Sequence, residues 1–551
     1  MEILSKVYSN YCRISLILLL TSFSFLMITS YTTNIQIYPP DPFYLFFNLS
    51  IYYWIGILIL IAVILIRINL NLGISKIIQF LDITILGLAT CYYSIITFIY
   101  PTIRYVDAYK FYWRLINPVI DAGTVGIQSY NSPMYNTIFN ASTIFFSYIF
   151  QFNLPPYIIA NTFPLLVVFS GSIITYILSS KYSSQYGVIG GIVFLFFYFI
   201  GCHLAPQNFA YIPAFFILFL MICLLTTGKK IYRIPLILLF PTVIFSHLLT
   251  NIILIYSFLG IIVLLIIYKF SQFQFPSILP NVLRYDRMNQ ELIIPTFLFV
   301  ISFISYLIYT NIIYFKKLID FSNIILASIL EYESEEISLV HRTVVNTTPH
   351  ILYIYDYQIR MAILFLYLLF SIIFSFTILY LYSKKSEKID NFPYCLLIII
   401  IFFITFSYGG ILILTGNSFY GFERSYPISL IPLGVLSTIF LSLNSSSNKI
   451  IKIIRSLFIV VVVLLIIIFP ISKYGSDPYH FFSESEDKAN QFGLTYNEKD
   501  FEHLNAFSNM IYNSRVLKQQ GGIKYLNAFE NNSLNKIYDV GKTKQIYSAV
   551  G

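Results

Sequence analysis

The sequence predicts an all-α multi-pass membrane protein of about 13 transmembrane helices, with interfacial helices in an outer loop and a small mixed α/β extracytoplasmic C-terminal domain. Of the 551 residues, 58% are hydrophobic, and only 11% are charged, against about 25% in soluble domains. Apolar runs long enough to cross a ~30 Å hydrocarbon core recur along most of the chain. Because soluble cores stop growing near ~250–300 residues, this composition excludes a soluble enzyme, a disordered protein and a nucleic-acid-binding protein.

The first apolar stretch follows Lys6 and Arg13 and lacks a small-residue cleavage site, which favours a retained span over a cleaved signal peptide. The expected spans are 12–30, 51–67, 78–100, 157–178, 187–202, 208–226, 232–247, 251–269, 292–314, 360–382, 395–415, 427–443 and 452–471. A further apolar stretch, 135–152, is ambiguous, because it carries several polar side chains and Pro155-Pro156 follows it.

The distribution of basic residues favours a surface position for 135–152. With that stretch on the surface the N-terminus is cytoplasmic, and the inner segments hold 17 of the 34 Lys and Arg residues while the outer loops hold eight. If 135–152 crossed the membrane instead, Lys181 and the cluster of Lys229, Lys230 and Arg233 would move outside. The sequence therefore predicts a multi-pass protein of the cell membrane with its C-terminal tail outside.

Four regions follow from these spans. The expected regions are a three-span N-terminal region (1–100), an extracytoplasmic loop with two interfacial helices (101–156), a transmembrane helical domain (157–471) and an extracytoplasmic tail domain (472–551). Alternating residues at 535–541 and 543–547 predict a pair of short strands in the tail. Ten of the 25 acidic residues fall in outer loops and five in inner segments, so the polar chemistry is expected outside.

Asp107 opens the first interfacial helix, 107–120, of the outer loop. Gly123 interrupts the helical pattern, and Asn131 and Tyr135 precede the second interfacial helix. An aspartate in this position is also explained by N-capping of the helix.

Two short turns each place a histidine and an amide at the outer boundary. His203 and Gln207 belong to the turn 203–208, and His247 belongs to the turn 246–251. Helix capping and polar contacts between spans explain these residues as well as ligand binding does. A metal site made by both histidines and Asp107 is less favoured, because no two of these ligands share a helical i, i+3 or i+4 spacing.

Glu423 and Arg424 lie at an expected outer helix start, just before the span 427–443. An arginine beside a helix N-terminus is a good site for a phosphate group, because its planar donors add to the backbone N–H groups. A solvated Glu423–Arg424 pair at the headgroup level is the alternative. The spans themselves carry essentially Asp82 alone, which argues against a proton-coupled transporter.

With these elements, the layout of residues 100–470 resembles the GT-C superfamily of integral-membrane glycosyltransferases, in particular its archaeal and bacterial members. The resemblance implies transfer of a sugar, with inversion, from a polyprenyl-phosphate-linked donor to a lipid, glycan or protein acceptor on the outer face of the membrane. It implies Asp107 as the catalytic base and Arg424 with His247 as the site for the donor phosphate. It further implies a substrate-binding role for the remaining outer residues, which are Tyr135, Asn131, His203, Gln207 and Glu423.

Three features depart from the family pattern. Two extra spans precede the loop that carries Asp107, Ala108 stands where many members have a second acid, and the WWDYG-type signature of oligosaccharyltransferases is missing. These departures favour a monosaccharide transferase and leave room for an inactive relative. The sequence assigns no certain cofactor and leaves a divalent Mg or Mn ion open. The competing hypothesis is a non-enzymatic polytopic membrane protein, such as a lipid or polysaccharide exporter or an assembly subunit.

Overall fold

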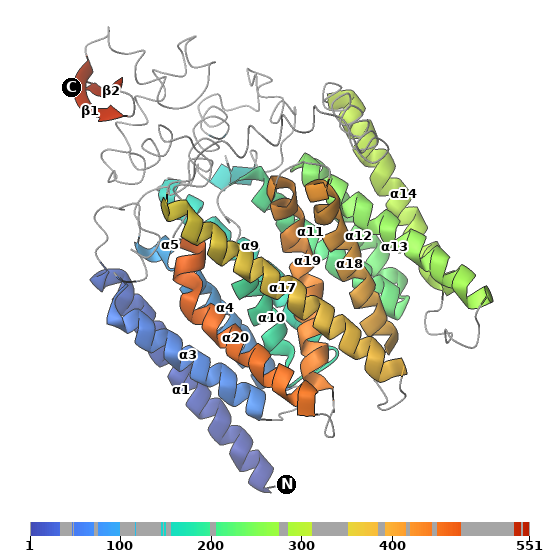
Figure 1. Cartoon of the computed structure of the whole chain (residues 1–551), viewed down its shortest axis with the longest axis horizontal. Coiled ribbons are helices and arrows are strands. Elements are labelled where there is room, and N and C mark those ends of the chain that lie inside the picture. Colours follow the sequence, from blue (N-terminus) through green and yellow to red (C-terminus); the bar gives the residue numbers. More distant parts are fainter. Residues whose placement is uncertain are drawn as a thin grey trace.

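A computed structural model describes the chain in segments. These are residues 2–33, 47, 49–70, 75–99, 116, 145–146, 148–149, 156–198, 205–274, 285–310, 351–383, 392–414, 419–443, 449–474, 534–540 and 544–549. Within them, every expected span overlaps a helix (Figure 1). The helices are α1 (Glu2–Thr32), α3 (Ile51–Asn69), α4 (Lys76–Tyr93), α5 (Ile96–Ile99), α9 (Pro156–Ser180), α10 (Gly187–Phe197), α11 (Pro206–Thr227), η2 (Lys230–Tyr232), α12 (Arg233–Ile244), α13 (Leu248–Gln274), α14 (Tyr285–Thr310), α17 (Ile351–Ser383), α18 (Phe392–Leu414), α19 (Phe419–Ser442) and α20 (Lys449–Tyr474).

Among the described residues, seven helices are long and apolar enough to cross a membrane, and they are α1, α3, α9, α11, α17, α19 and α20. Shorter apolar stretches occur in α10, α13, α14 and α18. Many large apolar side chains on these helices remain exposed, and soluble proteins do not expose so large an apolar surface to water. The fold is therefore that of a helical membrane protein.

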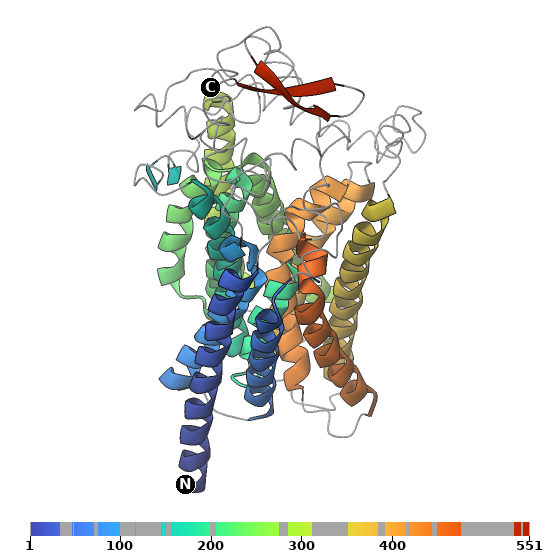
Figure 2. The same ribbon diagram turned by 90° about the vertical axis from the view of Figure 1, so that its left-hand side faces the viewer.

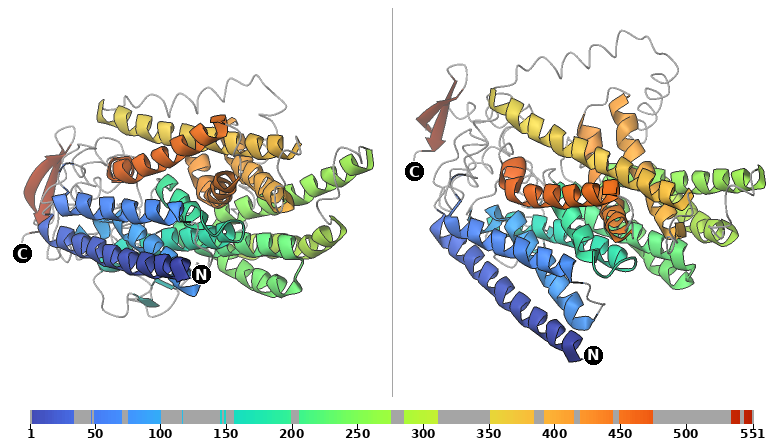
Figure 3. Two further views of the ribbon diagram at one scale, coloured as in Figure 1. Left: turned by 90° about the horizontal axis from the view of Figure 1, so that it is seen from below. Right: turned by 60° about the horizontal axis from the view of Figure 1, so that its bottom comes forward.

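The helices run alongside one another between two ends of a bundle (Figure 2). Short connections such as 181–186, 228–232 and 245–247 make consecutive helices antiparallel. We call the end where α1 begins the N-terminal end and the opposite end the distal end. Seen from below, α1 and α3 form one edge of the bundle and α14 lies toward the other (Figure 3).

The centre of the bundle is α10, in which every residue from Gly187 to Phe197 is buried. It contacts α4, α9, α19 and α20. Two glycines allow its close approach to α19, because a Cβ atom on Gly190 would lie 2.9 Å from the carbonyl oxygen of Gly434. On the other side, the Ser172 hydroxyl of α9 donates a hydrogen bond of 3.0 Å to the Gly191 carbonyl oxygen. Small residues at helix contacts are a common means of packing membrane helices closely.

The expected span 78–100 is interrupted, because α4 ends at Tyr93 and α5 runs only from Ile96 to Ile99. Two further helices are much shorter than the spans expected for them. The expected span 187–202 ends as a helix at Phe197, and the expected span 232–247 is helical only from Arg233 to Ile244. At 1.5 Å per residue these helices are about 17 and 18 Å long, well short of a ~30 Å hydrocarbon core. At the end of α10, tyrosine hydroxyls take the place of the helical hydrogen bonds: Tyr426 donates to the Phe197 carbonyl oxygen at 2.5 Å, and Tyr93 donates to the Tyr198 carbonyl oxygen.

In the tail, the described residues are β1 (Leu534–Val540) and β2 (Lys544–Ala549), which pair antiparallel with Leu534 opposite Ala549. They lie where the alternating sequence predicts a strand pair. The packing of the tail as a domain stays a prediction.

Candidate functional site

The expected site residues fall partly outside the described ranges. Asp107, Asn131, Tyr135 and His203 lie outside them. Glu423 and Arg424 are on α19, but only their backbone is described. The two expected site residues with described side chains are His247 and Gln207.

The helices that carry these residues meet at the distal end of the bundle. Gln207 is the second residue of α11, His247 lies in the turn between α12 and α13, and Arg424 lies near the start of α19. Helix α11 packs against both α13 and α19, and α13 packs against α19. Three segments that are well separated in the sequence therefore lie at the same end of one packed group of helices.

Aromatic packing holds part of the 101–156 region to the same end. The Phe146 ring lies 4.8 Å from the Phe163 ring of α9 and 5.9 Å from the Phe209 ring of α11. Phe209 is two residues after Gln207, and Ile116 of the same region is fully buried. Ile116 and Phe146 therefore belong to the core of the bundle, with Phe146 next to the start of α11, whereas Phe145 and Tyr148 are exposed.

His247 caps the start of α13. The backbone N–H of Thr250 donates to its Nδ1 at 3.4 Å, and the Thr250 hydroxyl lies 3.2 Å from the same atom. A ring whose Nδ1 accepts a hydrogen bond in this way carries its proton on Nε2, which makes Nε2–H a donor. The capping explanation of this histidine is confirmed.

Asn251 closes the same turn. Its side chain is fully buried, and Nδ2 donates to the carbonyl oxygens of Val243 at 3.1 Å and His247 at 3.0 Å. These bonds join the end of α12 to the turn and to the start of α13. The position of His247 therefore depends on Asn251.

Replacing Asn251 with aspartate should lower the free energy of unfolding by about 1–2 kcal/mol, because the carboxylate removes the donor and turns an acceptor toward carbonyl oxygens. Thermal unfolding in detergent, followed by circular dichroism, measures the change. Asn69→Asp is a matched control, since the exposed Asn69 makes a single bond to the Leu65 carbonyl oxygen. Equal stability of the two variants would contradict the assigned role of Asn251.

Gln207 makes a local contact on its own helix. Its Nε2 donates to the Tyr211 hydroxyl one turn further along α11, and Tyr211 is itself buried and stacked on Phe215. Ala205 is the N-cap and Pro206 the first residue of this helix. The rigid packing of Tyr211 thus orients Gln207 at the distal end.

Helix α19 begins at Phe419, eight residues before the start expected from Pro427. Pro427 and Pro432 both lie inside the helix, as prolines do in membrane helices when neighbouring groups satisfy the freed backbone. Arg424 is therefore in the second turn, and the unpaired backbone N–H groups of the first turn belong to residues before it. Arg424 therefore lies about one turn inside the helix, and not at its start as expected.

The sequence reasoning missed a buried ion pair at the N-terminal end. Arg67 Nε donates to Asp82 Oδ1 at 2.8 Å, and Arg67 Nη2 donates to Asp82 Oδ2 at 3.1 Å and to the Ser184 carbonyl oxygen at 2.6 Å. The Tyr176 hydroxyl adds a bond of 3.1 Å to Asp82 Oδ2. Arg67 and Asp82 are 0% and 1% exposed.

This pair corrects the expectation that Asp82 is essentially alone in the spans. The sequence does contain a signal that Arg67 is buried, because isoleucines flank it on both sides near the end of an apolar run. The pair joins α3, α4, α9 and the turn before α10, at the end opposite Gln207 and His247.

In the part of the chain that the structure describes, no group of three or more His, Cys, Asp or Glu residues could hold a metal ion. Asp107 and His203 lie outside that part, so a divalent Mg or Mn ion stays open.

The sequence matches no protein-family model, and no curated protein matches it significantly.

Proposed function

We propose that this protein is a multi-pass membrane glycosyltransferase that moves a sugar from a polyprenyl-phosphate-linked donor to a lipid, glycan or protein acceptor on the extracytoplasmic face. The proposal includes 13 spans, a cytoplasmic N-terminus, interfacial helices in the 101–156 region and an extracytoplasmic tail domain. The distal end of the bundle is then the outer end.

The convergence at the distal end carries this proposal. The starts of α11 and α19 and the turn that holds His247 belong to helices that pack on one another. Phe146 packs beside the start of α11. A reaction between a lipid-linked donor and an acceptor needs such a meeting of several segments at the membrane surface, because proximity and orientation supply much of the rate enhancement.

The charges of the described helix ends support the orientation. Basic residues gather at the N-terminal end, among them Lys76, Lys181, Lys229, Lys230 and Lys452. Cytoplasmic segments of membrane proteins carry such an excess of Lys and Arg. The described site residues Gln207 and His247 are at the opposite end, where a lipid-linked sugar on the outer face would be used.

The chemistry assigns one role to each group. Asp107 accepts the proton of the acceptor hydroxyl, whose oxygen forms a bond to the anomeric carbon while the bond from that carbon to the phosphate oxygen breaks. Arg424 and the Nε2–H of His247 stabilise the polyprenyl phosphate that leaves as an anion. Asn131, Tyr135, His203, Gln207 and Glu423 hold the sugar and the acceptor. A single displacement of this kind inverts the anomeric carbon.

An exporter would require a polar path through the middle of the bundle. The side chains that the structure describes inside the bundle are mainly apolar, and the buried polar ones are Ser, Thr and Asn apart from the Arg67–Asp82 pair. That pair lies near the N-terminal end, where Asp82 accepts hydrogen bonds from Arg67 and Tyr176. These observations favour the enzyme over the exporter.

The test is sugar transfer by the purified protein in lipid vesicles, with radiolabelled polyprenyl-phosphate hexoses as donors and a membrane extract as the source of acceptor. Asp107→Asn should lower turnover by about 10²–10⁴-fold, because it removes the base. Arg424→Gln should lower it by about 10²–10³-fold, because it removes stabilisation of the leaving phosphate. Asp121→Asn, in the same region, is the matched control and should retain activity. Full turnover by Asp107→Asn would overturn the assignment of the base.

A distance measurement tests the site without a known acceptor. In a background where the five native cysteines are alanine, cysteines at positions 107 and 424 should be joined by bis-maleimide linkers shorter than about 15 Å, the reach of a sugar phosphate plus acceptor. Cross-linking only by longer reagents would rule out the mechanism.

A further inference from the structure

Two exposed lysines lie in the turn between α11 and α12. Gly228, with a φ of 63°, ends α11, and Lys229 and Lys230 follow it at the start of η2. Both lysines are exposed, and no other part of the described chain lies within 4 Å of the position that a Cβ atom on Gly228 would take. The described residues therefore leave this turn open to its surroundings.

An exposed apolar stripe begins directly beside these lysines. Ile231, Ile234 and Leu238 are 72%, 67% and 69% exposed, and their spacing of three and four residues places them on one face of α12. Lys230 is four residues before Ile234 and therefore lies at the end of the same face, whereas Phe240 is buried. From Ile231 to Leu238 the stripe is about 10 Å long, which fits within the ~15 Å of one hydrocarbon leaflet.

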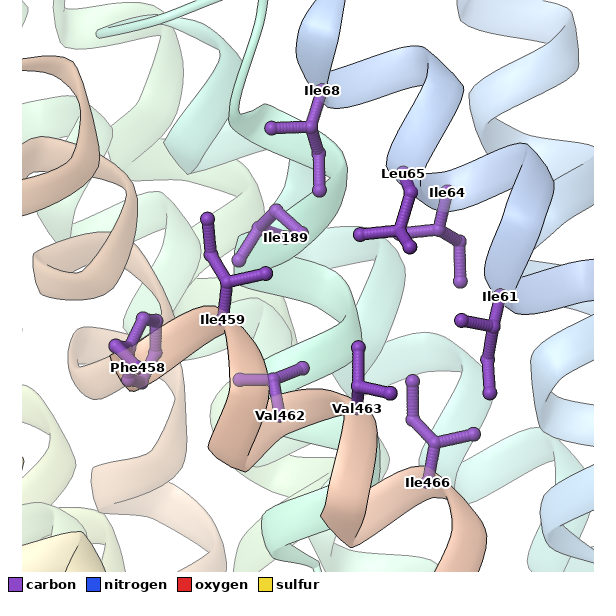
Figure 4. A pocket seen from close by; sticks show the side chains of 10 residues that line it. All are labelled: Ile61, Ile64, Leu65, Ile68, Ile189, Phe458, Ile459, Val462, Val463 and Ile466. Atoms are coloured by element: carbon purple, nitrogen blue, oxygen red, sulfur yellow. The ribbon is translucent and has the colours of Figure 1, made fainter. Parts of the chain in front are cut away.

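A lipid chain has to lie on such an outer face, because side chains close the spaces between packed helices. Between α3, α10 and α20, for example, Ile64, Ile189 and Val462 fill the contact and are buried (Figure 4). Helix α12 lies on the other side of the bundle from α1 and α3 (Figure 1). Its stripe faces outward over its whole length, so an acyl chain can lie along it.

The helices around the turn supply no negative charge to the two lysines. Between Asp121 and Asp286 the sequence contains no Asp or Glu residue, so α9, α10, α11, α12 and α13 carry none. In the part of the chain that the structure describes, no ion pair involves either lysine. Lysines at the edge of a hydrocarbon region attract anionic headgroups. A negative group from the membrane would therefore complete this site.

We propose that an anionic phospholipid binds here, with its phosphate beside Lys229 and Lys230 and one acyl chain along Ile231, Ile234 and Leu238. The two cations and the apolar stripe adjoin on one face, and this order matches a negative headgroup followed by a hydrocarbon chain. A free phosphate would use the lysines and leave the stripe unused. The site lies at the opposite end of the bundle from the proposed catalytic residues, so it is independent of the proposed glycosyl transfer.

Tryptophan quenching by brominated lipids tests the proposal in nanodiscs. In a parent in which Trp54 and Trp113 are replaced by phenylalanine, Leu238→Trp places a reporter on the stripe, and Leu58→Trp places a control on the exposed side of α3. At an equal, low mole fraction, brominated phosphatidylglycerol should quench the reporter at 238 at least about fivefold more than brominated phosphatidylcholine, since each nearby cation favours anionic lipid by about that factor. At 58 the two lipids should quench equally.

Charge removal identifies what recognises the headgroup. Lys229→Gln with Lys230→Gln should reduce the preference at 238 to about one. Lys449→Gln with Lys452→Gln removes the same charge from two exposed lysines at the start of α20 and should leave the preference unchanged. If Leu238→Trp fails to fold, a tryptophan at position 234 reports on the same stripe. Equal quenching at 238 by both lipids, an equal preference at 58, or a preference that survives the Lys229 and Lys230 changes would each overturn the proposal.

The start of α14 is the competing source of negative charge, because this helix packs against α12 and contains Asp286 and Glu291. Asp286→Asn with Glu291→Gln should leave the lipid preference at 238 unchanged. A preference that arises only in this variant would mean that these carboxylates, and not a lipid, neutralise Lys229 and Lys230, and the proposal would then be wrong.

Discussion

Replacing Asp82 with alanine should destabilise the protein by about 3–5 kcal/mol, because it leaves the Arg67 guanidinium buried without its counter-charge. Both residues are essentially inaccessible, and two hydrogen bonds of 2.8 and 3.1 Å join them. A pair on the surface would contribute less than about 1 kcal/mol. Burial inside the helix bundle therefore decides the size of the effect.

The reverse change should cost less. Arg67→Met leaves an aspartate that still accepts a bond from Tyr176 and that can become neutral by taking up a proton, whereas a guanidinium keeps its charge. The double variant with Arg67→Met and Asp82→Leu should have nearly the stability of the natural protein, since apolar side chains of similar size often replace a buried pair without loss.

Thermal unfolding of the four proteins in one detergent, completed as a double-mutant cycle, measures the coupling. Lys229→Met is the control for loss of a cation at the same end, and it should change the stability little because Lys229 is exposed. If the double variant is as unstable as the sum of the two single variants, the pair does not act as a unit.

The sequence predicts the helices well because their cause is local. Every expected span overlaps a helix in the described residues, since a run of apolar side chains must be helical to satisfy its backbone in lipid. The ends of the helices are less predictable because they depend on distant partners. Helix α10 ends at Phe197. The Phe197 carbonyl oxygen accepts its hydrogen bond from the hydroxyl of Tyr426, 229 positions away along the chain, instead of from a further turn of the helix.

The same distinction between local and distant partners decides which contacts of single residues the sequence predicts. His247 as a cap for α13 involves Thr250, three residues away, and the sequence offers that explanation directly. The Arg67–Asp82 pair requires that two antiparallel helices place residues 15 positions apart at the same depth, and composition alone does not give that register. Arg424 was expected at a helix start because proline usually begins helices, but packing extends α19 upstream through Pro427.

The second large effect concerns the contact between α10 and α19, where Gly434→Ala should lower the free energy of unfolding by about 3 kcal/mol. The added Cβ atom would lie 2.5 Å from the carbonyl oxygen of Gly190, which cannot move aside because it belongs to helical backbone. Gly190→Ala should have a similar effect, since its Cβ atom would lie 2.9 Å from the Gly434 carbonyl oxygen.

Gly87→Ala is the matched control, because the nearest atom to its added Cβ is a Phe169 ring carbon at 3.7 Å, an ordinary contact. Alanine is about 1 kcal/mol more favourable than glycine inside a helix, so Gly87→Ala should be neutral or stabilising. The opposite signs of the Gly87 and Gly434 effects, measured by thermal unfolding in the same detergent, separate steric exclusion from helix propensity. Stabilisation by Gly434→Ala would mean that α10 and α19 do not pack through these glycines, and the buried position of α10 at the centre of the bundle would then have to be abandoned, because the approach of α19 at this point is what closes that side of α10.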